Sequence, residues 1–265
     1  MNEMKGNSLA VFNSNDIYPV SADSELPFEQ HRDIFHLSGI DQEETILLLY
    51  PPSKDDKTRE ILFIRKSDNH TKVWEGEKLS KKQANELSGI DNIYYIEDFK
   101  AVLSSIATKV DTFYINKNEH YRANSPVETR EDRFISWLLK KYPAHNVAKS
   151  NPILQRQRSI KHPHEIEQIK RACEITKKGF NRVLKFIKPN IWEYEIEAEF
   201  IHEFINNSSK GFAYSPIIAS GHDNNVLHYI KNNKQCKSGE LILMDVGAEY
   251  GNYSSDMTRT VPVSG

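Results

Sequence analysis

The stretch Glu240-Leu-Ile-Leu-Met-Asp-Val-Gly-Ala-Glu-Tyr-Gly-Asn-Tyr-Ser-Ser-Asp256 decides the fold of the second half of the chain. An apolar run, a turn-forming Tyr-Gly pair and a second β-rich segment follow one another in it, and this order predicts an antiparallel hairpin. With Tyr250-Gly251 as the turn, Asp245 is directly opposite Asp256. Facing residues share one side of a sheet, with Cβ atoms roughly 4.5–5.5 Å apart. The hairpin is therefore expected to bring two carboxylates together.

The surroundings of Asp245 indicate a metal site as one interpretation of this pair. Leu241 and Leu243 share its face of the strand, and the alternate positions are also apolar, which is typical of a buried strand. Buried carboxylates repel each other and lose hydration, and a divalent cation, or a pair of them, would offset both penalties. The alternative is an ordinary hairpin whose acidic residues lie in a polar network or face solvent. The spacing alone does not decide between these two interpretations.

The composition is that of a folded protein that binds neither nucleic acid nor membrane. The 265 residues are 38% hydrophobic, 27% charged and 10% aromatic, which is enough for one large domain or two ordinary ones. A net charge of −2 provides no basic surface for nucleic acid. Neither a secretory signal nor an apolar run of membrane-spanning length is present in the sequence. Two distant cysteines fit a reducing compartment, so a cytoplasmic protein is expected.

The first part of the chain alternates between strand-like and helix-like segments, a pattern that predicts an α/β domain over residues 1–150. The segments are residues 46–50 and 61–64, predicted as strands, and residues 81–87 and 130–141, predicted as helices. The Asn151-Pro152 pair indicates a linker over residues 151–158. A second domain is expected over residues 159–265.

The second domain is predicted to contain two helices followed by strands. The first helix begins at His162-Pro-His-Glu165 and is expected to end at Lys177-Lys178-Gly179, because acidic residues near its start and basic residues near its end suit the helix dipole. The second helix covers residues 192–206. Glu199 and His202 within it have the spacing of di-iron ligands, but a single copy is more typical of a solvated helix face.

His228 lies between a polar loop and the acidic hairpin. A histidine close to a metal site can donate a hydrogen bond to a developing oxyanion or exchange a proton with substrate. The alternative interpretation is a half-buried histidine whose hydrogen bonds are satisfied within the protein. The sequence pattern leaves both open.

Six passages, three in each half of the chain, carry a likeness to one known family. In the first half they are Ser21-Ala-Asp-Ser-Glu-Leu-Pro-Phe-Glu-Gln30, Asp33-Ile-Phe-His-Leu-Ser-Gly39 and Trp74-Glu-Gly-Glu-Lys-Leu79. In the second half they are Arg158-Ser-Ile-Lys161 with Glu165-Ile-Glu-Gln-Ile-Lys-Arg-Ala172, Gly221-His-Asp-Asn-Asn-Val-Leu-His-Tyr229, and Leu243-Met-Asp-Val-Gly-Ala-Glu-Tyr-Gly-Asn-Tyr-Ser-Ser-Asp-Met-Thr-Arg-Thr260. In these passages the chain resembles the pita-bread metallopeptidases, most closely the Xaa-Pro aminopeptidases (aminopeptidase P).

The resemblance implies an α/β N-terminal domain of the creatinase and aminopeptidase P type, followed by the first half of an α+β pita-bread catalytic domain. It also implies that Asp245 binds one of two divalent metal ions, commonly manganese, and that Asp256 bridges both. His228 would lie beside the scissile peptide bond as a catalytic residue. The implied reaction removes the N-terminal residue from peptides with proline in second position, by attack of a metal-activated hydroxide. A homo-oligomer is implied as well.

The chain departs from the family pattern after the hairpin. The family completes its site with a further histidine and two glutamates downstream, whereas this sequence stops at Gly265. The chain alone is therefore expected to be inactive, either as the N-terminal portion of a longer enzyme or as a catalytically dead relative. A prolidase-type dipeptidase and a non-catalytic binding or assembly module of the same fold are the alternative functions.

Overall fold

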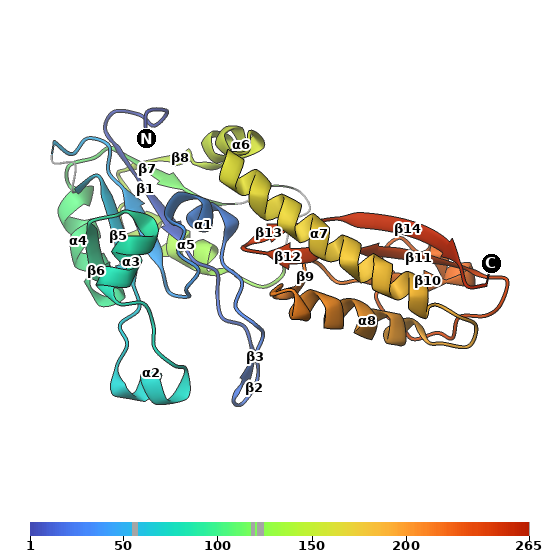
Figure 1. Ribbon diagram of the computed structural model, residues 1–265. Helices are drawn as coiled ribbons and strands as arrows, with labels where there is room; N and C mark the ends of the chain where they lie inside the picture. The colour runs from blue at the N-terminus through green and yellow to red at the C-terminus, as the bar shows by residue number, and fades with distance from the viewer. Residues whose placement is uncertain (55–57, 118–119, 121–124, 265) are drawn as a thin grey trace. The chain divides into compact units, whose positions relative to one another are not determined.

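The computed structural model describes residues 1–54, 58–117, 120 and 125–264, and it divides into two compact units, Met1–Ile160 and Lys161–Gly265 (Figure 1). Residues 151–158, expected to be a linker, lie within helix α6 (Asn151–Ser159) of the first unit. Pro152 is in the first turn of this helix, where a residue without an N–H group breaks no hydrogen bond. Leu154 is buried in the core of the first unit, so α6 is part of its packing.

The first unit is built on a six-stranded sheet with the order β6-β5-β4-β1-β7-β8. Its strands are β1 (Ser8–Asn13), β4 (Ile46–Leu49), β5 (Glu60–Ile64), β6 (Asn92–Tyr95), β7 (Thr112–Ile115) and β8 (Asn146–Lys149). Strand β1 pairs antiparallel with β4 and parallel with β7, so the sheet is mixed. The strands predicted at residues 46–50 and 61–64 are confirmed as β4 and β5.

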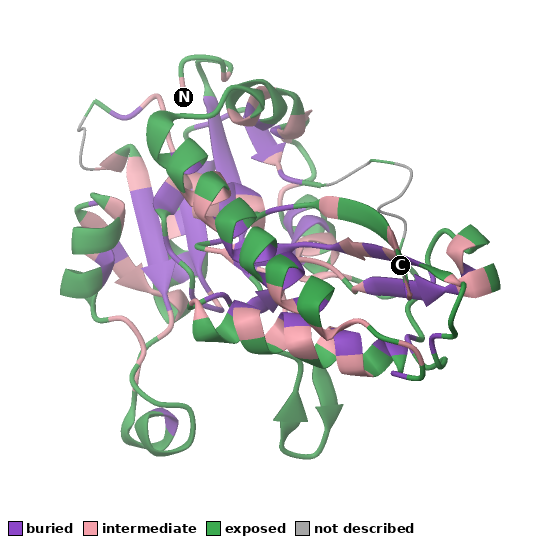
Figure 2. Ribbon diagram, turned by 45° about the vertical axis from the view of Figure 1, so that its right-hand side comes forward, coloured by how far each residue is buried: buried purple, intermediate pink, exposed green. Residues whose placement is uncertain are grey.

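Helices cover both faces of this sheet. They are α1 (Arg32–Ser38), α3 (Lys81–Ser88), α4 (Phe99–Ala107), which follows the 3-10 turn η2 (Ile96–Asp98), and α5 (Arg130–Lys141), in addition to α6. On β1, Leu9 and Val11 pack into the core that contains α4 and α5, whereas Ala10 and Phe12 pack into the core with α1, α3 and α6. The short helix α2 (Asn69–Trp74) and the hairpin of β2 (Pro19–Ser21) and β3 (Ser24–Glu25) are mostly exposed (Figure 2).

Two long helices, α7 (Pro163–Phe186) and α8 (Glu193–Asn206), open the second unit. Both predicted helices are confirmed, but α7 does not end at Gly179. A Cβ atom at this position would lie 2.8 Å from the rings of Phe200 and Phe204, so the glycine allows α7 and α8 to pack closely. Among the residues that the structure describes, no helix is both long and apolar enough to cross a membrane.

The strands of the second unit form two three-stranded sheets, β10-β11-β14 and β13-β12-β9. The strands are β9 (Gly211–Phe212), β10 (Ile217–Ser220), β11 (Leu241–Val246), β12 (Ala248–Tyr250), β13 (Tyr253–Ser254) and β14 (Met257–Pro262). Helices α7 and α8 pack on one face of the first sheet, where Ile242, Met244 and Val246 are buried. Asp245 lies on the opposite face and is only half-buried, so the prediction that both faces of this strand are buried is wrong.

Candidate metal centre

The turn of the acidic hairpin is Gly251-Asn252, one residue later than the predicted Tyr250-Gly251. Tyr250 pairs with Tyr253, and the two residues between them have φ values of +57° and +67°. Two successive positive φ angles define a type I′ turn, which glycine and asparagine tolerate and tyrosine does not. The chain therefore folds at the pair of residues that can adopt this backbone conformation.

This shift of the turn changes the partner of Asp245. The residue opposite Asp245 is Thr258, not Asp256, so the predicted direct opposition of the two aspartates is wrong. Asp256 instead lies just before β14, where the chain passes from one sheet to the other. Any meeting of the two carboxylates must therefore depend on the local geometry at this crossing.

Gly247 makes that crossing possible on the facing strand. It separates β11 from β12, and a Cβ atom there would lie 1.9 Å from the backbone oxygen of Ser255. The backbone N–H of Ala213 donates to the Gly247 carbonyl at 2.8 Å, which fixes the crossing from a third segment. The two strands of the hairpin can therefore approach each other closely at Ser255, next to Asp256, only because residue 247 has no side chain.

A buried hydroxyl pair fixes the backbone next to Asp256. The hydroxyl of Ser255 lies 2.6 Å from that of Thr176 on α7, and both side chains are buried. The backbone N–H of Ala248 donates to these hydroxyls, at 2.9 Å to Thr176 and 3.0 Å to Ser255. The residue before Asp256 is thereby tied to a helix and to the opposite strand, and the direction of the Asp256 backbone follows from these contacts.

Tyr214 brings the two carboxylates to one point. Its hydroxyl donates to Oδ1 of Asp245 at 2.6 Å, and Oδ1 of Asp256 lies 3.2 Å from the same oxygen. Burial and the hydrogen bond to Asp245 raise the pKa of Tyr214, so the phenol stays protonated. A phenol has a single proton to donate. The two carboxylates therefore share one donor, and the predicted proximity arises through Tyr214 rather than through direct strand pairing.

The chemistry of this pair suits a hard divalent cation. Two aspartates offer four carboxylate oxygens, whereas Tyr214 supplies one proton, which leaves oxygens free to coordinate. Within the described part of the chain, no group of three or more His, Cys, Asp or Glu residues is placed to hold a metal ion. Asp245 and Asp256 thus provide part of a ligand set.

His228 lies on an exposed turn rather than on a strand. The 3-10 turn η4 (Gly221–Asn225) precedes it. The next residue, Tyr229, is buried against Ile217 and Ala219. Because Ile217 pairs with Asp245, this contact places the loop over the face of the sheet that carries Asp245. The loop that bears His228 thus lies over the Asp245 face, but His228 forms no ligand group with the two aspartates.

Both halves of the chain match known protein families. Residues 1–114 match the aminopeptidase P N-terminal domain, and residues 167–265 match metallopeptidase family M24. The chain combines an aminopeptidase P N-terminal domain with a family M24 domain. The predicted fold, an α/β domain followed by a domain of the pita-bread metallopeptidases, is thereby confirmed.

Relatives of this M24 chain are named Xaa-Pro aminopeptidases. The Escherichia coli protein is 31% identical over 92% of the chain and 56% of its own length, and human Xaa-Pro aminopeptidase 3 is 30% identical over 95% and 50%. The structure of zinc-substituted E. coli aminopeptidase P in complex with product has a TM-score of 0.86 and 29% identity, over 99% of this chain and 60% of its own. The chain spans about half the length of the curated relatives it matches.

Sequence reasoning missed three polar residues that position the two aspartates: Tyr214, Thr176 and Ser255. Each acts through a contact between segments far apart in the sequence, with separations of 31 residues for Tyr214 to Asp245 and 79 for Thr176 to Ser255. No motif or periodicity marks a tyrosine in a loop or a threonine on a helix as a partner of a distant aspartate. The only local signal was Gly247, since a glycine between two strand segments indicates a bulge or a close backbone approach.

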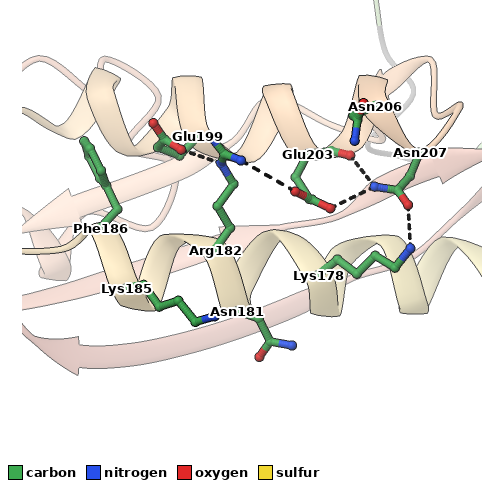
Figure 3. Close-up of a pocket in the computed structure, with 9 residues that line it drawn as sticks. All are labelled: Lys178, Asn181, Arg182, Lys185, Phe186, Glu199, Glu203, Asn206 and Asn207. Atoms are coloured by element: carbon green, nitrogen blue, oxygen red, sulfur yellow. Dashed lines mark hydrogen bonds and ion pairs between the residues drawn. The ribbon is translucent and has the colours of Figure 1, made fainter.

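A groove between α7 and α8 is lined by charged and polar side chains (Figure 3). Arg182 reaches across it, ion-paired with Glu199 and with its Nη1 3.9 Å from Glu203. Lys178 donates to the side-chain oxygen of Asn207 at 2.6 Å. Glu199 is thus engaged by an arginine, which agrees with the prediction that it belongs to a solvated helix face rather than to a metal site with His202.

Proposed function

We propose that the protein is a metal-dependent aminopeptidase that removes the N-terminal residue from peptides with proline in second position. The convergence of Asp245 and Asp256 on the single hydroxyl of Tyr214 carries this proposal. The names of the relatives and the match to metallopeptidase family M24 support the reaction class. The proline specificity rests on the relatives' names and on the match of the first unit to the aminopeptidase P N-terminal domain.

In this proposal each residue of the crossing has a defined task. Asp245 would hold one divalent ion and Asp256 would contribute to holding both, with manganese as the expected metal. When bound, these ions would polarise the scissile carbonyl and lower the pKa of a water molecule. Tyr214 orients the Asp245 carboxylate through its hydrogen bond, and the contacts of Ser255 hold the backbone of Asp256. His228 donates to the substrate carbonyl from its loop.

The chain by itself is proposed to bind metal without turning over substrate. The described residues supply two carboxylates to the site and no third acidic or histidine ligand. Hydrolysis also needs a general base within hydrogen-bond reach of the attacking water. Both aspartates are assigned to metal binding, so neither is available for that task.

Two measurements test the proposal. Calorimetric titration of Mn²⁺ into this chain and into its Asp245→Asn variant should show binding that the variant loses. Peptidase activity of the native protein should be assayed with a tripeptide that has proline second, the matching alanine tripeptide, and the Xaa-Pro dipeptide. Cleavage of the proline tripeptide alone supports the proposal, and cleavage of only the dipeptide indicates the prolidase-type alternative. If the chain binds no metal, a non-catalytic module of the same fold is left.

A further inference from the structure

Glu193, the first residue of α8, is a completely buried carboxylate with four hydrogen-bond donors. Its Oε1 accepts from the backbone N–H and the hydroxyl of Ser220, both at 2.7 Å. Its Oε2 accepts from the hydroxyl of Tyr229 at 2.7 Å and from the backbone N–H of Lys234 at 2.9 Å. A buried charge is stable only when such donors replace its hydration, and here each oxygen has two.

These four bonds link the two faces of the β10-β11-β14 sheet. Helix α8 packs on the face that contains Ile218, whereas Tyr229 packs on the face of Ile217 and Ala219. Ile217 is the strand partner of Asp245, so Tyr229 covers the sheet next to the acidic pair. Through the Tyr229 hydroxyl, Glu193 therefore reaches from the helical side of the sheet to the side of the candidate metal centre.

The same carboxylate also closes the loop that carries His228. Ser220 is the last residue of β10 before the loop, and Lys234 lies beyond its far end. Tyr229 follows His228 directly. One buried group thus holds the beginning, the middle and the end of this segment, whereas His228 itself is exposed. An exposed side chain gains a fixed position only from the backbone that bears it, and here that backbone is tied to Glu193.

We propose that Glu193 is the positioning residue for His228: its carboxylate anchors loop 221–233 over the Asp245 face of the sheet. The anchoring concerns this chain alone, and only the consequence for catalysis rests on the proposed function. Two asparagines also hold this loop, and Asn224 donates to the Leu241 carbonyl at 3.0 Å and accepts from the Leu243 N–H at 3.2 Å. Asn232 accepts from the Ile218 N–H at 3.0 Å and donates to Glu197 at 2.8 Å, but these contacts do not include Tyr229.

Thiol alkylation of this chain tests the anchor without any need for activity. Cys236 is fully buried two residues after Lys234, and its N–H donates to the Ile191 carbonyl at 2.8 Å, whereas Cys173 is exposed and serves as an internal reference. In Glu193→Gln an NH₂ group replaces one carboxylate oxygen and cannot accept from the two donors that faced that oxygen. Native-state alkylation of Cys236 should accelerate about tenfold relative to Cys173, because charged hydrogen bonds are lost from the closed state.

Glu195→Gln is the matched control. It removes one negative charge from the same first turn of α8, and Glu195 accepts from the Trp192 N–H at 2.6 Å without contacting the loop. Its Cys236 rate should stay close to that of the unmodified chain. Equal rates of Cys236 alkylation in the two glutamine variants would overturn the proposal that Glu193 anchors the loop. If Glu193→Gln does not fold, Tyr229→Phe removes a single donor and should accelerate Cys236 by a smaller factor; an unchanged rate in that variant would equally overturn the anchor.

Peptidase kinetics of the native protein test the consequence for His228. Glu193→Gln should lower kcat and leave KM close to its original value, since a displaced histidine affects the reacting carbonyl more than the rest of the peptide. Combined with His228→Ala, it should cause no further loss, because both changes remove one shared contribution. Losses that multiply would show that Glu193 acts independently of His228. Absence of any peptidase activity would refute the proposed function and leave the alkylation result on the anchor intact.

Discussion

The carboxylates of the second unit fall into two groups that differ in how many donors the protein supplies. Glu193 is fully buried and receives four hydrogen bonds, whereas Asp245 and Asp256 share the hydroxyl of Tyr214 and are partly or largely exposed. A carboxylate whose two oxygens both accept hydrogen bonds from the protein stabilises the fold and has no oxygen left for a ligand. A pair with too few donors repels internally and gains from a cation. The count of donors thus separates an anchoring role from a binding role.

The largest expected effect comes from Gly247→Ala, which breaks the crossing that brings the aspartates together. The added Cβ would lie 1.9 Å from the Ser255 carbonyl oxygen, so the backbone must move. We expect a loss of about 4 kcal/mol in the unfolding free energy of the second unit, measured by urea denaturation. Gly6→Ala is the control, because nothing lies within 4 Å of its added Cβ. Equal stability of both variants would show that the crossing is not tightly packed.

Removal of the Glu193 carboxylate should have the next largest effect. Glu193→Ala leaves the N–H of Lys234, the hydroxyl of Tyr229 and both donors of Ser220 without their acceptor. We expect about 3 kcal/mol of destabilisation, since buried donors that lose a charged partner are costly. Glu195→Ala, which removes one capping bond from the same helix turn, should cost about 1 kcal/mol. If the two losses are equal, Glu193 is an ordinary helix cap rather than an anchor.

Removal of the Asp245 charge should have the opposite consequence: it should weaken metal binding and leave the stability of the protein unchanged. Asp245→Asn should weaken Mn²⁺ binding by about 100-fold or more, the upper end of what loss of an outer-shell partner alone causes. The metal-free protein should keep its stability, because the substitution removes one of two repelling charges. Calorimetric titration and urea denaturation measure both quantities. Glu203→Gln, on α8 in the groove that Arg182 crosses, should leave binding unchanged. A destabilised metal-free variant would place Asp245 with Glu193 as a structural carboxylate.

The sequence predicts those features of the second unit that depend on the conformational preferences of neighbouring residues. The strand β11 and the hairpin that follows it are predicted from residues close in the chain, whereas the meeting of Asp245 with Asp256 depends on Tyr214 and Gly247. The turn lies one residue later than predicted, because both of its central residues have positive φ angles, which Gly251-Asn252 tolerates and Tyr250-Gly251 does not. Tyr214 and the donors of Glu193 could not be predicted, since they meet their partners across folded elements.

The four donors of Glu193 also explain why its role is invisible in the sequence. A glutamate in the first turn of a helix is favoured by the helix dipole, and nothing local distinguishes an exposed example from a buried one. Only the packing of Tyr229 on the opposite face of the sheet, and the return of the chain at Lys234, bring donors to it. Burial of a charged residue is thus a property of the whole unit rather than of its segment.

Tyr214→Phe should have the smallest effect. It tests the difference between Glu193 and the two aspartates directly, because it removes the one donor that the aspartates share. The metal-free protein should lose about 1 kcal/mol, the value of one hydrogen bond. Mn²⁺ affinity should fall by about tenfold, at the lower end for a residue that orients a ligand. A rise in affinity would instead mean that the phenol competes with the metal for the carboxylate oxygens. In that case the hydrogen bond from Tyr214 would stabilise the metal-free protein but would weaken metal binding by Asp245 and Asp256. The number of donors would then identify Glu193 as an anchor without explaining why the two aspartates bind metal.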